Sequence, residues 1–411
     1  GRTGTVDWQT GSIKTATFTA ANGEGYFANT SGGAFTMNLP AGVVGNIVSV
    51  VDYTNTFQTN NLTISPNGSE KIGGIAQDAF LTSEGQSVTF VYVDGTEGWK
   101  NIQDSTSNVT GSPFLQATGG TVTTCGNFKI HTFTGPGTFC VSAVSTNCAA
   151  ENTVGYQVVG GGGGGSNGGG GGGGFREGRN APIDNFTASP LVANAPTNAV
   201  TVTATSFPII VGAGGAINTA GAVSTFSTIT SAGGGEGGSG DTSDAGGTGG
   251  SGGGGASQCG PAPSPSPTGG GAGGAGNTPP VSPSQGSTGG IGGAGYYYVG
   301  GGGGGAGATG STGTTAGPGG SPTSGGNGGN GVSSSITGSS VTRAGGGGGM
   351  RWTQNPGTPG QGGTGGGGDA GAAGTAGTAG TVNTGGGGGG CSAYCTSNGT
   401  PGICGQPAAA G

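Results

Sequence analysis

The feature that most constrains this chain is the glycine sequence that begins at Gly160 and recurs as far as Gly390. Glycine fills residues 160–174 except at Ser166 and Asn167, and pure runs return at 300–305, 345–349 and 385–390. The chain holds 112 glycines in 411 residues, where about 7% is the usual share. Because glycine has no side chain, only the first 160 or so residues can bury a conventional apolar core.

Between the pure runs the glycines keep a period of three, as at 362, 365, 368, 371, 374, 377 and 380. A helix of the polyproline-II type has three residues per turn and no internal hydrogen bonds, so its N–H and C=O groups point outward. Side-chain-free helices can approach until these groups pair, as buried backbone requires. The spacing predicts a polyglycine-II helix bundle with loops over residues 160–411, and a flexible Gly/Ser coil is the alternative. Collagen is excluded because the triplets at 374–379 contain no proline.

The first 114 residues have a period of two. Alternating segments at 15–19, 35–39 and 61–64, and apolar runs at Ile47–Val51 and Val88–Val93, predict short strands. Turn sequences such as Asn22-Gly23 and Asp94-Gly95 separate them. The pattern predicts an all-β sandwich or small barrel with essentially no α-helix.

Residues 115–159 predict a second, smaller β unit with strands near 121–123, 128–133, 138–142 and 156–159. His131, the one histidine of the chain, lies in the second of these. On an alternating strand it is expected at a surface or an interface rather than in a catalytic role.

Several motifs carry a resemblance over about the first 110 residues. In order they are Gly25-Tyr26-Phe27, Asn38-Leu39-Pro40, Val50-Val51-Asp52-Tyr53, and Val91-Tyr92-Val93-Asp94-Gly95 followed by Gly98-Trp99. This string resembles a module of bacteriophage tail-fibre and virion structural proteins, especially those of marine cyanophages. The resemblance implies a structural bead of a homotrimeric fibre without catalytic residues, located in the virion and extracellular. It implies self-association, other virion proteins and a bacterial surface receptor as partners.

The glycine-rich half is similar to the polyglycine domain of phage adhesins, which display variable loops from one end. That similarity draws attention to aromatic, arginine and methionine residues next to glycine runs, since Tyr, Trp and Arg dominate interface energetics. The receptor-binding candidates are Phe175, Arg176, Arg179, Met350, Arg351, Trp352 and Tyr394. The equally weighted alternative is that such residues close an end of the bundle.

Apolar residues stand before three of the glycine runs: Val158-Val159, Ile209-Ile210-Val211 and Tyr297-Tyr298-Val299. The similarity of these three apolar segments predicts that each is a strand that docks on one shared apolar layer and leads into one of several parallel glycine helices.

Seven cysteines make an odd set, so at least one thiol is unpaired or intermolecular. Cys140 with Cys148, and two of Cys391, Cys395 and Cys404, are candidates for local disulfides. The last three could instead be zinc thiolates, but no histidine is near enough to complete four ligands. Disulfides or free thiols are therefore favoured, and no metal or other cofactor is expected.

Other functions find little support. The formal net charge is −7 and the 9 Lys and Arg form no basic cluster, which argues against nucleic acid and anionic membranes. No apolar run is long enough to span a bilayer, and Gly1-Arg2-Thr3-Gly4 does not begin a signal peptide. No nucleotide, calcium or hydrolase motif has the context it needs, so no enzyme is expected. The alternatives are a purely structural capsid, baseplate or filament subunit, and an ice-binding polyglycine bundle.

Overall fold

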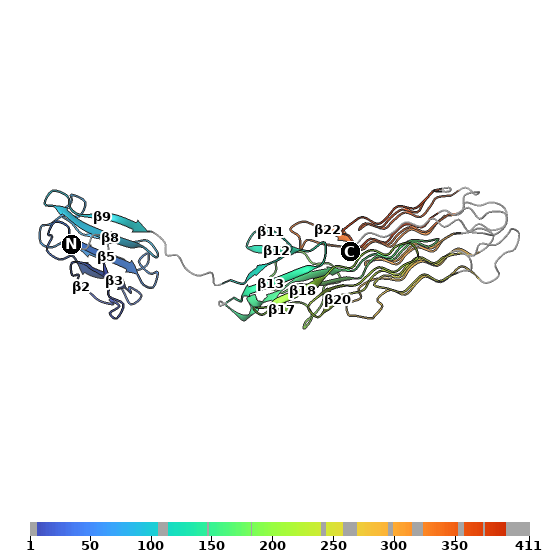
Figure 1. The fold of residues 1–411 in the computed structure, drawn as a ribbon, viewed down its shortest axis with the longest axis horizontal. Coiled ribbons are helices and arrows are strands. Elements are labelled where there is room, and N and C mark those ends of the chain that lie inside the picture. The colour runs from blue at the N-terminus through green and yellow to red at the C-terminus, as the bar shows by residue number, and fades with distance from the viewer. Residues whose placement is uncertain are drawn as a thin grey trace. The chain divides into compact units, whose positions relative to one another are not determined.

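The computed structural model describes residues 6–105, 114–145, 148–181, 183–239, 244–257, 269–294, 299–314, 324–351, 357–372 and 375–391. The chain divides into two compact units, Gly1–Ser112 and Pro113–Gly411. Each is described by itself (Figure 1).

The first unit consists of two open sheets. One has the strand order β1 (Asp7–Trp8), β3 (Glu24–Ala28), β5 (Ile47–Asp52), β8 (Ser87–Asp94) and β9 (Gly98–Ser105). The other has the order β2 (Phe18–Thr19), β4 (Phe35–Asn38), β6 (Leu62–Ser65) and β7 (Ala79–Leu81). From β1 to β6 the chain alternates between the sheets, so β1, β3 and β5 are parallel, as are β2, β4 and β6. Among the described residues neither sheet closes on itself, and the barrel alternative is therefore wrong.

The core of this unit lies between the inward-facing residues of both sheets. On β4, Phe35 and Met37 are buried while Thr36 and Asn38 are partly exposed, and β6 alternates in the same way. Trp99 and Phe57 are the largest fully buried side chains. The alternation is the period of two that the sequence showed, because successive side chains of a strand point to opposite faces.

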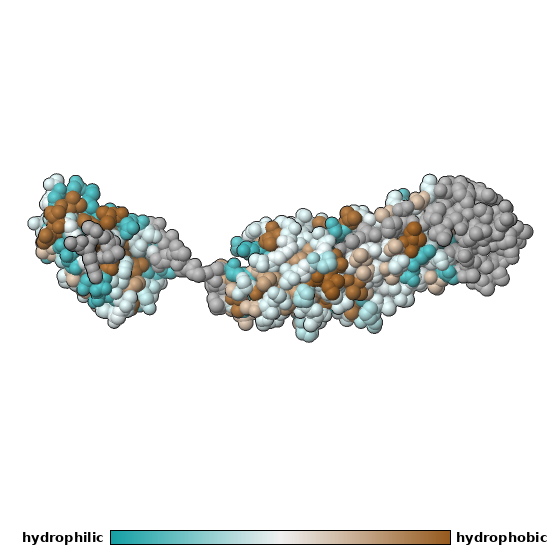
Figure 2. Space-filling model, viewed as in Figure 1, coloured by the Kyte–Doolittle hydropathy of each residue, from teal (hydrophilic) through white to brown (hydrophobic). Residues whose placement is uncertain are grey.

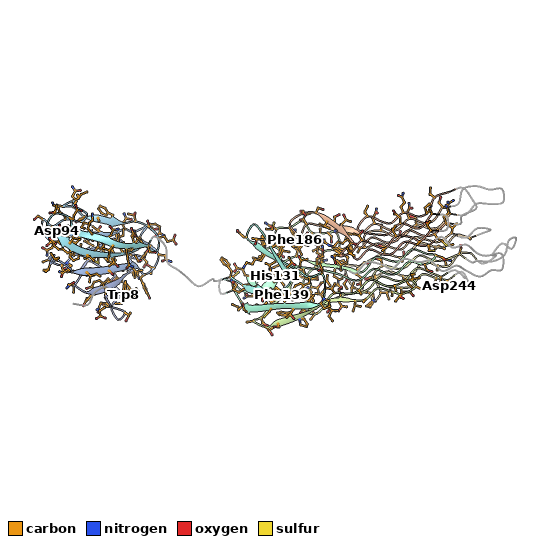
Figure 3. The ribbon with its side chains drawn as sticks, turned by 45° about the horizontal axis from the view of Figure 1, so that its top comes forward. Trp8, Asp94, His131, Phe139, Phe186 and Asp244 are labelled. Carbon is orange, nitrogen blue, oxygen red and sulfur yellow. The ribbon has the colours of Figure 1, made fainter. Side chains whose placement is uncertain are left out.

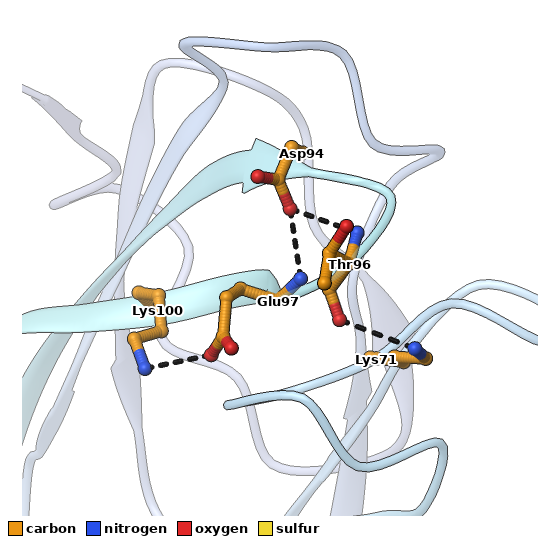
Figure 4. Close-up of polar contacts among 5 residues, drawn as sticks. All are labelled: Lys71, Asp94, Thr96, Glu97 and Lys100. Carbon is orange, nitrogen blue, oxygen red and sulfur yellow. Dashed lines mark hydrogen bonds and ion pairs between the residues drawn. The ribbon is translucent and has the colours of Figure 1, made fainter.

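A short turn joins β8 to β9 and is held by one carboxylate (Figure 4). Asp94 accepts hydrogen bonds from the amides of Thr96 and Glu97, both at 2.8 Å. These bonds favour the ionised carboxylate and lower the pKa of Asp94. Lys71 Nζ donates to the Thr96 carbonyl oxygen at 3.2 Å, and Lys100 pairs with Glu97 at 2.8 Å. The predicted Asp94-Gly95 turn is confirmed.

The second unit combines short strands with the glycine-rich segments. Its largest sheet has the order β10 (Gln116–Thr118), β13 (Gly137–Ala143), β18 (Ser206–Ile210), β19 (Ser224–Phe226) and β20 (Ile229–Ser231). Four further antiparallel pairs are β11 (Thr121–Cys125) with β12 (Phe128–Thr132), β14 (Thr153–Val154) with β17 (Val200–Thr201), β15 (Tyr156–Val159) with β16 (Phe175–Gly178), and β21 (Val332–Ser334) with β22 (Val341–Arg343).

Three of the strands before Gly160, β13, β14 and β15, pair with strands that come after it. In particular, β13 pairs with β18 and β15 pairs with β16. Phe139, Val158, Val200 and Phe226 accordingly share one buried cluster. Residues 115–159 thus lie in the same compact unit as the glycine-rich region.

The described residues are all-β, as predicted. Their one helical element is a single 3-10 turn, η1 (Ala149–Asn152). None of the described helices has the length and apolar character needed to cross a membrane. The visible face of the glycine-rich unit is mostly pale in Figure 2, because glycine, serine and threonine have intermediate hydropathy.

Tyr26, on β3, generates a prediction about alkaline pH. Its hydroxyl donates to Glu24 at 2.5 Å and accepts from the Ala21 amide at 2.7 Å. Burial, and next the hydrogen bond to Glu24, raise the pKa of Tyr26 to about 12. A raised pKa favours the folded state below the ordinary tyrosine pKa of about 10, and this stabilisation is lost as pH rises toward 12. Ultraviolet titration should show that Tyr26 ionises late, as should Tyr156, whose pKa burial also raises. Tyr26→Phe should remove one late component and leave that of Tyr156, and an unchanged titration curve would contradict the assignment.

Candidate functional site: the glycine array and its two ends

The glycine-rich segments between residues 160 and 391, called here the glycine array, run side by side away from the strands of the second unit (Figure 1). These segments form neither α-helix nor β-strand. Backbone hydrogen bonds between different segments hold them together. The array has little conventional side-chain core.

Residues 168–174 form the central segment of the array, and their amides donate in three directions. Gly168, Gly171 and Gly174 donate to the carbonyl oxygens of residues 238, 235 and 232, at 2.7–3.1 Å. Gly169 and Gly172 donate to residues 301 and 304, and Gly170 and Gly173 to residues 388 and 385. Donors three residues apart therefore reach the same neighbour, and one neighbour is parallel while the other two are antiparallel.

The carbonyl oxygens of the central segment supply three further directions. Those of residues 168, 171 and 174 accept from residues 166, 163 and 160, while those of 169 and 172 accept from 254 and 251. Gly170 accepts from Gly347 at 2.8 Å. The central segment thus has six bonded neighbours, which are 160–166, 232–238, 251–254, 301–304, 347 with its flanking residues, and 385–388.

The segment 300–306 repeats this pattern. Its amides at 300, 303 and 306 donate to residues 350, 347 and 344, those at 301 and 304 to 255 and 252, and those at 302 and 305 to 311 and 308. Its carbonyl oxygens accept from residues 169 and 172, 287 and 290, and 326 and 329. Six neighbours around more than one segment make the array a laterally bonded lattice rather than a string of loops.

Glycine is required in these segments because the neighbours leave no room for a side chain. A Cβ at Gly170 would lie 2.0 Å from the Gly163 carbonyl oxygen, and one at Gly169 would lie 2.1 Å from that of Gly347. The same crowding recurs at Gly171, Gly172 and Gly173. Each obstacle is backbone, and the carbonyl oxygens of Gly163 and Gly347 are themselves hydrogen-bonded. An added methyl group therefore cannot be accommodated by turning a side chain.

At the end next to the strands, Gln285 closes the array. The side chain is fully buried; its Nε2 donates to the Pro279 carbonyl oxygen at 2.8 Å and its Oε1 accepts from the Ala232 amide at 2.9 Å. Its backbone carbonyl oxygen accepts from the Phe175 amide at 2.8 Å. Gln285 thereby pairs backbone groups where the regular pattern stops, as buried polar groups require.

A buried charge lies at the same end. Glu177, fully buried on β16, accepts the Ser189 amide through Oε2 at 2.6 Å. Its Oε1, like Nη1 of Arg343, has no hydrogen-bond partner within the part of the chain that the structure describes. Burial lowers the pKa of Arg343, and the negative charge of Glu177 acts in the opposite direction. Glu177 and Arg343 therefore attract each other. Removing one of them would leave the other as a buried charge without that compensation, which is costly.

The seven predicted receptor-binding residues differ in how far they are exposed to solvent. Phe175, Arg176 and Met350 are only 1%, 8% and 1% exposed, so for these three the prediction is wrong: they offer no surface to a receptor. Arg179 and Arg351 are partly exposed. Trp352 and Tyr394 lie outside the described residues.

Phe175 instead packs with Ala306, Val332 and Ala344 in a small buried cluster. The alternative prediction, that such residues close an end of the array, therefore describes Phe175. Sequence spacing alone does not decide between the two predictions, because a large apolar residue after a glycine run can equally face inward or outward.

The far end of the array gathers several segment ends. The Met350 amide donates to the Asn167 carbonyl oxygen at 2.9 Å and the Cys391 amide to that of Ser166 at 2.7 Å. Arg351 bridges to Val299. Val299 is thus at the end opposite Val159, which precedes Gly160, and the prediction of three similar entries on one apolar layer is wrong. The reason is that the array contains antiparallel neighbours, so runs enter it from both ends.

The described cysteines correct a further prediction. Cys140 and Cys148 are free thiols and do not form the predicted disulfide. Ser206 Oγ donates to the Cys140 sulfur at 3.5 Å across the β13–β18 pair. Cys391 is buried, while Cys395 and Cys404, its possible partners, lie outside the described residues.

Side chains capable of acid–base or metal chemistry do not cluster in the described part of the chain. His131 Nδ1 is 2.8 Å from the Gly119 carbonyl oxygen, and its ring contacts that of Phe139 edge-on at 5.0 Å (Figure 3). Within the described ranges no three His, Cys, Asp or Glu residues are arranged to hold a metal ion. What the array offers is a set of segments held together by lateral backbone hydrogen bonds.

Comparison with protein-family models and with curated proteins finds no match for this chain.

The crowding in the array predicts the effect of one methyl group. Gly170→Ala should lower the free energy of unfolding of the second unit by at least about 3 kcal/mol, because it overpacks buried backbone and separates hydrogen-bonded segments. Gly135→Ala is the matched control, since a Cβ there meets nothing within 4 Å. Thermal and denaturant unfolding of both variants measures the difference, and equal stability would contradict the packing described above.

Proposed function

We propose that the segments of the glycine array are polyglycine-II helices packed in a roughly hexagonal bundle. Two features support this: amides three residues apart donate to the same neighbour, and inner segments have six neighbours. A helix with three residues per turn directs every third amide the same way. Without side chains, all three directions can be bonded at once.

Such a bundle is a stiff support. At a rise of about 3.1 Å per residue, a seven-residue segment spans roughly 20 Å. Bending it would require breaking hydrogen bonds to several neighbours together. A glycine-rich coil would instead change shape freely, so the lateral bonding is the observation that carries the functional proposal.

We infer that the protein is a subunit of a phage virion fibre or adhesin, which recognises a bacterial surface receptor from the far end of the array. The described segments that finish at Ser239, Ser257, Thr314, Arg351 and Cys391 place those residues at the end that includes Asn167 and Asp244, the latter labelled in Figure 3. A rigid base whose described segments finish together at one end suits recognition of a surface.

Self-association as a homotrimer completes the proposal. Several copies held on one fibre raise the effective concentration of each weak contact and turn it into stable attachment. The first unit would then serve assembly with other virion proteins. A purely structural appendage would share the stiff array and the assembly contacts, but it would bind no cell.

The two partly exposed arginines provide a test because they lie at opposite ends of the array. Arg351 is next to Met350 at the far end, whereas Arg179 donates to the Phe186 carbonyl oxygen beside the strands. Labelled full-length protein should bind intact marine cyanobacterial cells, measured by flow cytometry over a panel of strains. Arg351→Ala should weaken that binding by about ten-fold, about 1.4 kcal/mol, and Arg179→Ala should leave it unchanged.

Light scattering of the same sample should give the mass of a trimer. Binding to none of the strains by a correctly folded trimer would overturn receptor recognition in favour of the structural role. Equal loss in both arginine variants would overturn recognition from the far end.

A further inference from the structure

The outer face of the five-stranded sheet in the first unit carries a row of side chains in register. Trp8 on β1 is level with Gly25 on β3, which is level with Ser49 on β5. Ser49 is level with Thr89 on β8, and Thr89 with Gln103 on β9. One aromatic ring, two hydroxyl groups and an amide are therefore aligned across the whole sheet.

Gly25 allows the indole to lie against the sheet. A Cβ at this position would be 2.7 Å from Trp8 Cδ2, so any other residue would push the ring away. The indole is nevertheless 41% exposed. It contacts Phe27, with ring centroids 5.3 Å apart, and Phe27 contacts the exposed Tyr53 at 6.2 Å. The three rings form a partly exposed aromatic ridge beside the row.

A hollow of about 530 Å³ lies over the same row. Its lining includes Trp8 and the exposed Ile102 as apolar walls, together with Ser49, Thr89 and Gln103. The two hydroxyl groups are 2.7 Å apart and bond to each other. Binding sites for small molecules occupy about 300–1,000 Å³ and combine apolar walls with a few placed polar groups. The volume of the hollow lies in this range, and its lining is mostly polar, with Trp8 and Ile102 as its largest apolar side chains.

The charge of the hollow narrows the class of ligand. Among the residues that the structure describes, Asp104 is the one ionisable side chain in the lining, and no lysine or arginine lines the hollow. Asp104 accepts from Gln86 Nε2 at 3.2 Å through one oxygen, Oδ1. A carboxylate without a nearby cation repels anionic ligands and accepts hydrogen bonds from neutral hydroxyl groups.

We propose that this hollow binds a neutral saccharide, with one sugar ring stacked on the indole of Trp8. A pyranose has an apolar C–H face that fits an aromatic ring and a rim of hydroxyl groups that fits Thr89, Gln103 and Asp104. The ridge through Phe27 and Tyr53 continues from Trp8, so an oligosaccharide can extend along it. This site is in the first unit and does not depend on the proposed role of the glycine array.

The test is calorimetric titration of the full-length protein with malto-, cello-, xylo- and mannohexaose, accompanied by tryptophan fluorescence. At least one hexaose should bind and change the fluorescence. Trp8→Ala should weaken that binding at least about ten-fold, and Gln103→Ala should weaken it to a smaller extent. Phe80→Ala is the matched control, because Phe80 is an aromatic residue of the same unit, 60% exposed and outside the lining. The Phe80→Ala variant should bind the hexaose with the same affinity as the unmodified protein.

Several results would overturn the proposal. One is that none of the four hexaoses binds. Another is that the Trp8→Ala and Phe80→Ala variants bind with equal affinity. A third is a Trp8 fluorescence signal that depends on protein concentration alone, which would make this face of the sheet a contact between copies of the chain. Gln103→Ala guards against misfolding of the Trp8 variant, since Gln103 is exposed and its replacement leaves the aromatic ridge intact.

Discussion

Backbone hydrogen bonding between segments is the interaction on which the second unit depends. The central segment has little side-chain surface to bury, and its six neighbours instead satisfy its N–H and C=O groups. Ordering glycine costs more conformational entropy than ordering any other residue. Pairing in all lateral directions offsets that cost only when the segments are close enough to exclude a Cβ, and this is why the runs contain so few other residues.

Different interactions complete the two ends of the array. Next to the strands, Gln285, Phe175 and the buried Glu177 occupy positions where the regular pattern stops. At the far end, backbone bonds between segment ends, such as Met350 to Asn167, complete the array. The proposed role in attachment rests on this difference between the two ends.

Much of the fold could be predicted from periodicity. The strands containing Met37, Ile64 and Val50 followed from alternation. The period of three predicted glycine segments that bond side by side, and their polyglycine-II geometry stays a proposal. β9 was missed because its residues are mostly polar and exposed. The paired strands β15 and β16 were only half predicted, because the pairing of Val159 with Phe175 spans a glycine run. No local pattern encodes such a contact.

The candidate sites were harder to predict than the fold. Whether Met350 or Arg351 faces outward depends on which end of the array its segment reaches, and sequence spacing does not fix that direction. The row from Trp8 to Gln103 is formed by four strand pairings. It therefore brings together residues nearly a hundred positions apart, and a scan for short motifs cannot detect it.

Amide hydrogen exchange of the intact protein tests the central claim most directly. The peptide that contains residues 160–174 has amides bonded to four other segments, 219–222, 232–238, 301–304 and 385–388, and to one another, so these amides should exchange only when the array opens. Strong protection there, matched in residues 300–306 and 344–350, is the result predicted. Complete exchange within the dead time of the experiment would contradict the account, because the glycine-rich half would then be a tether without lateral bonding.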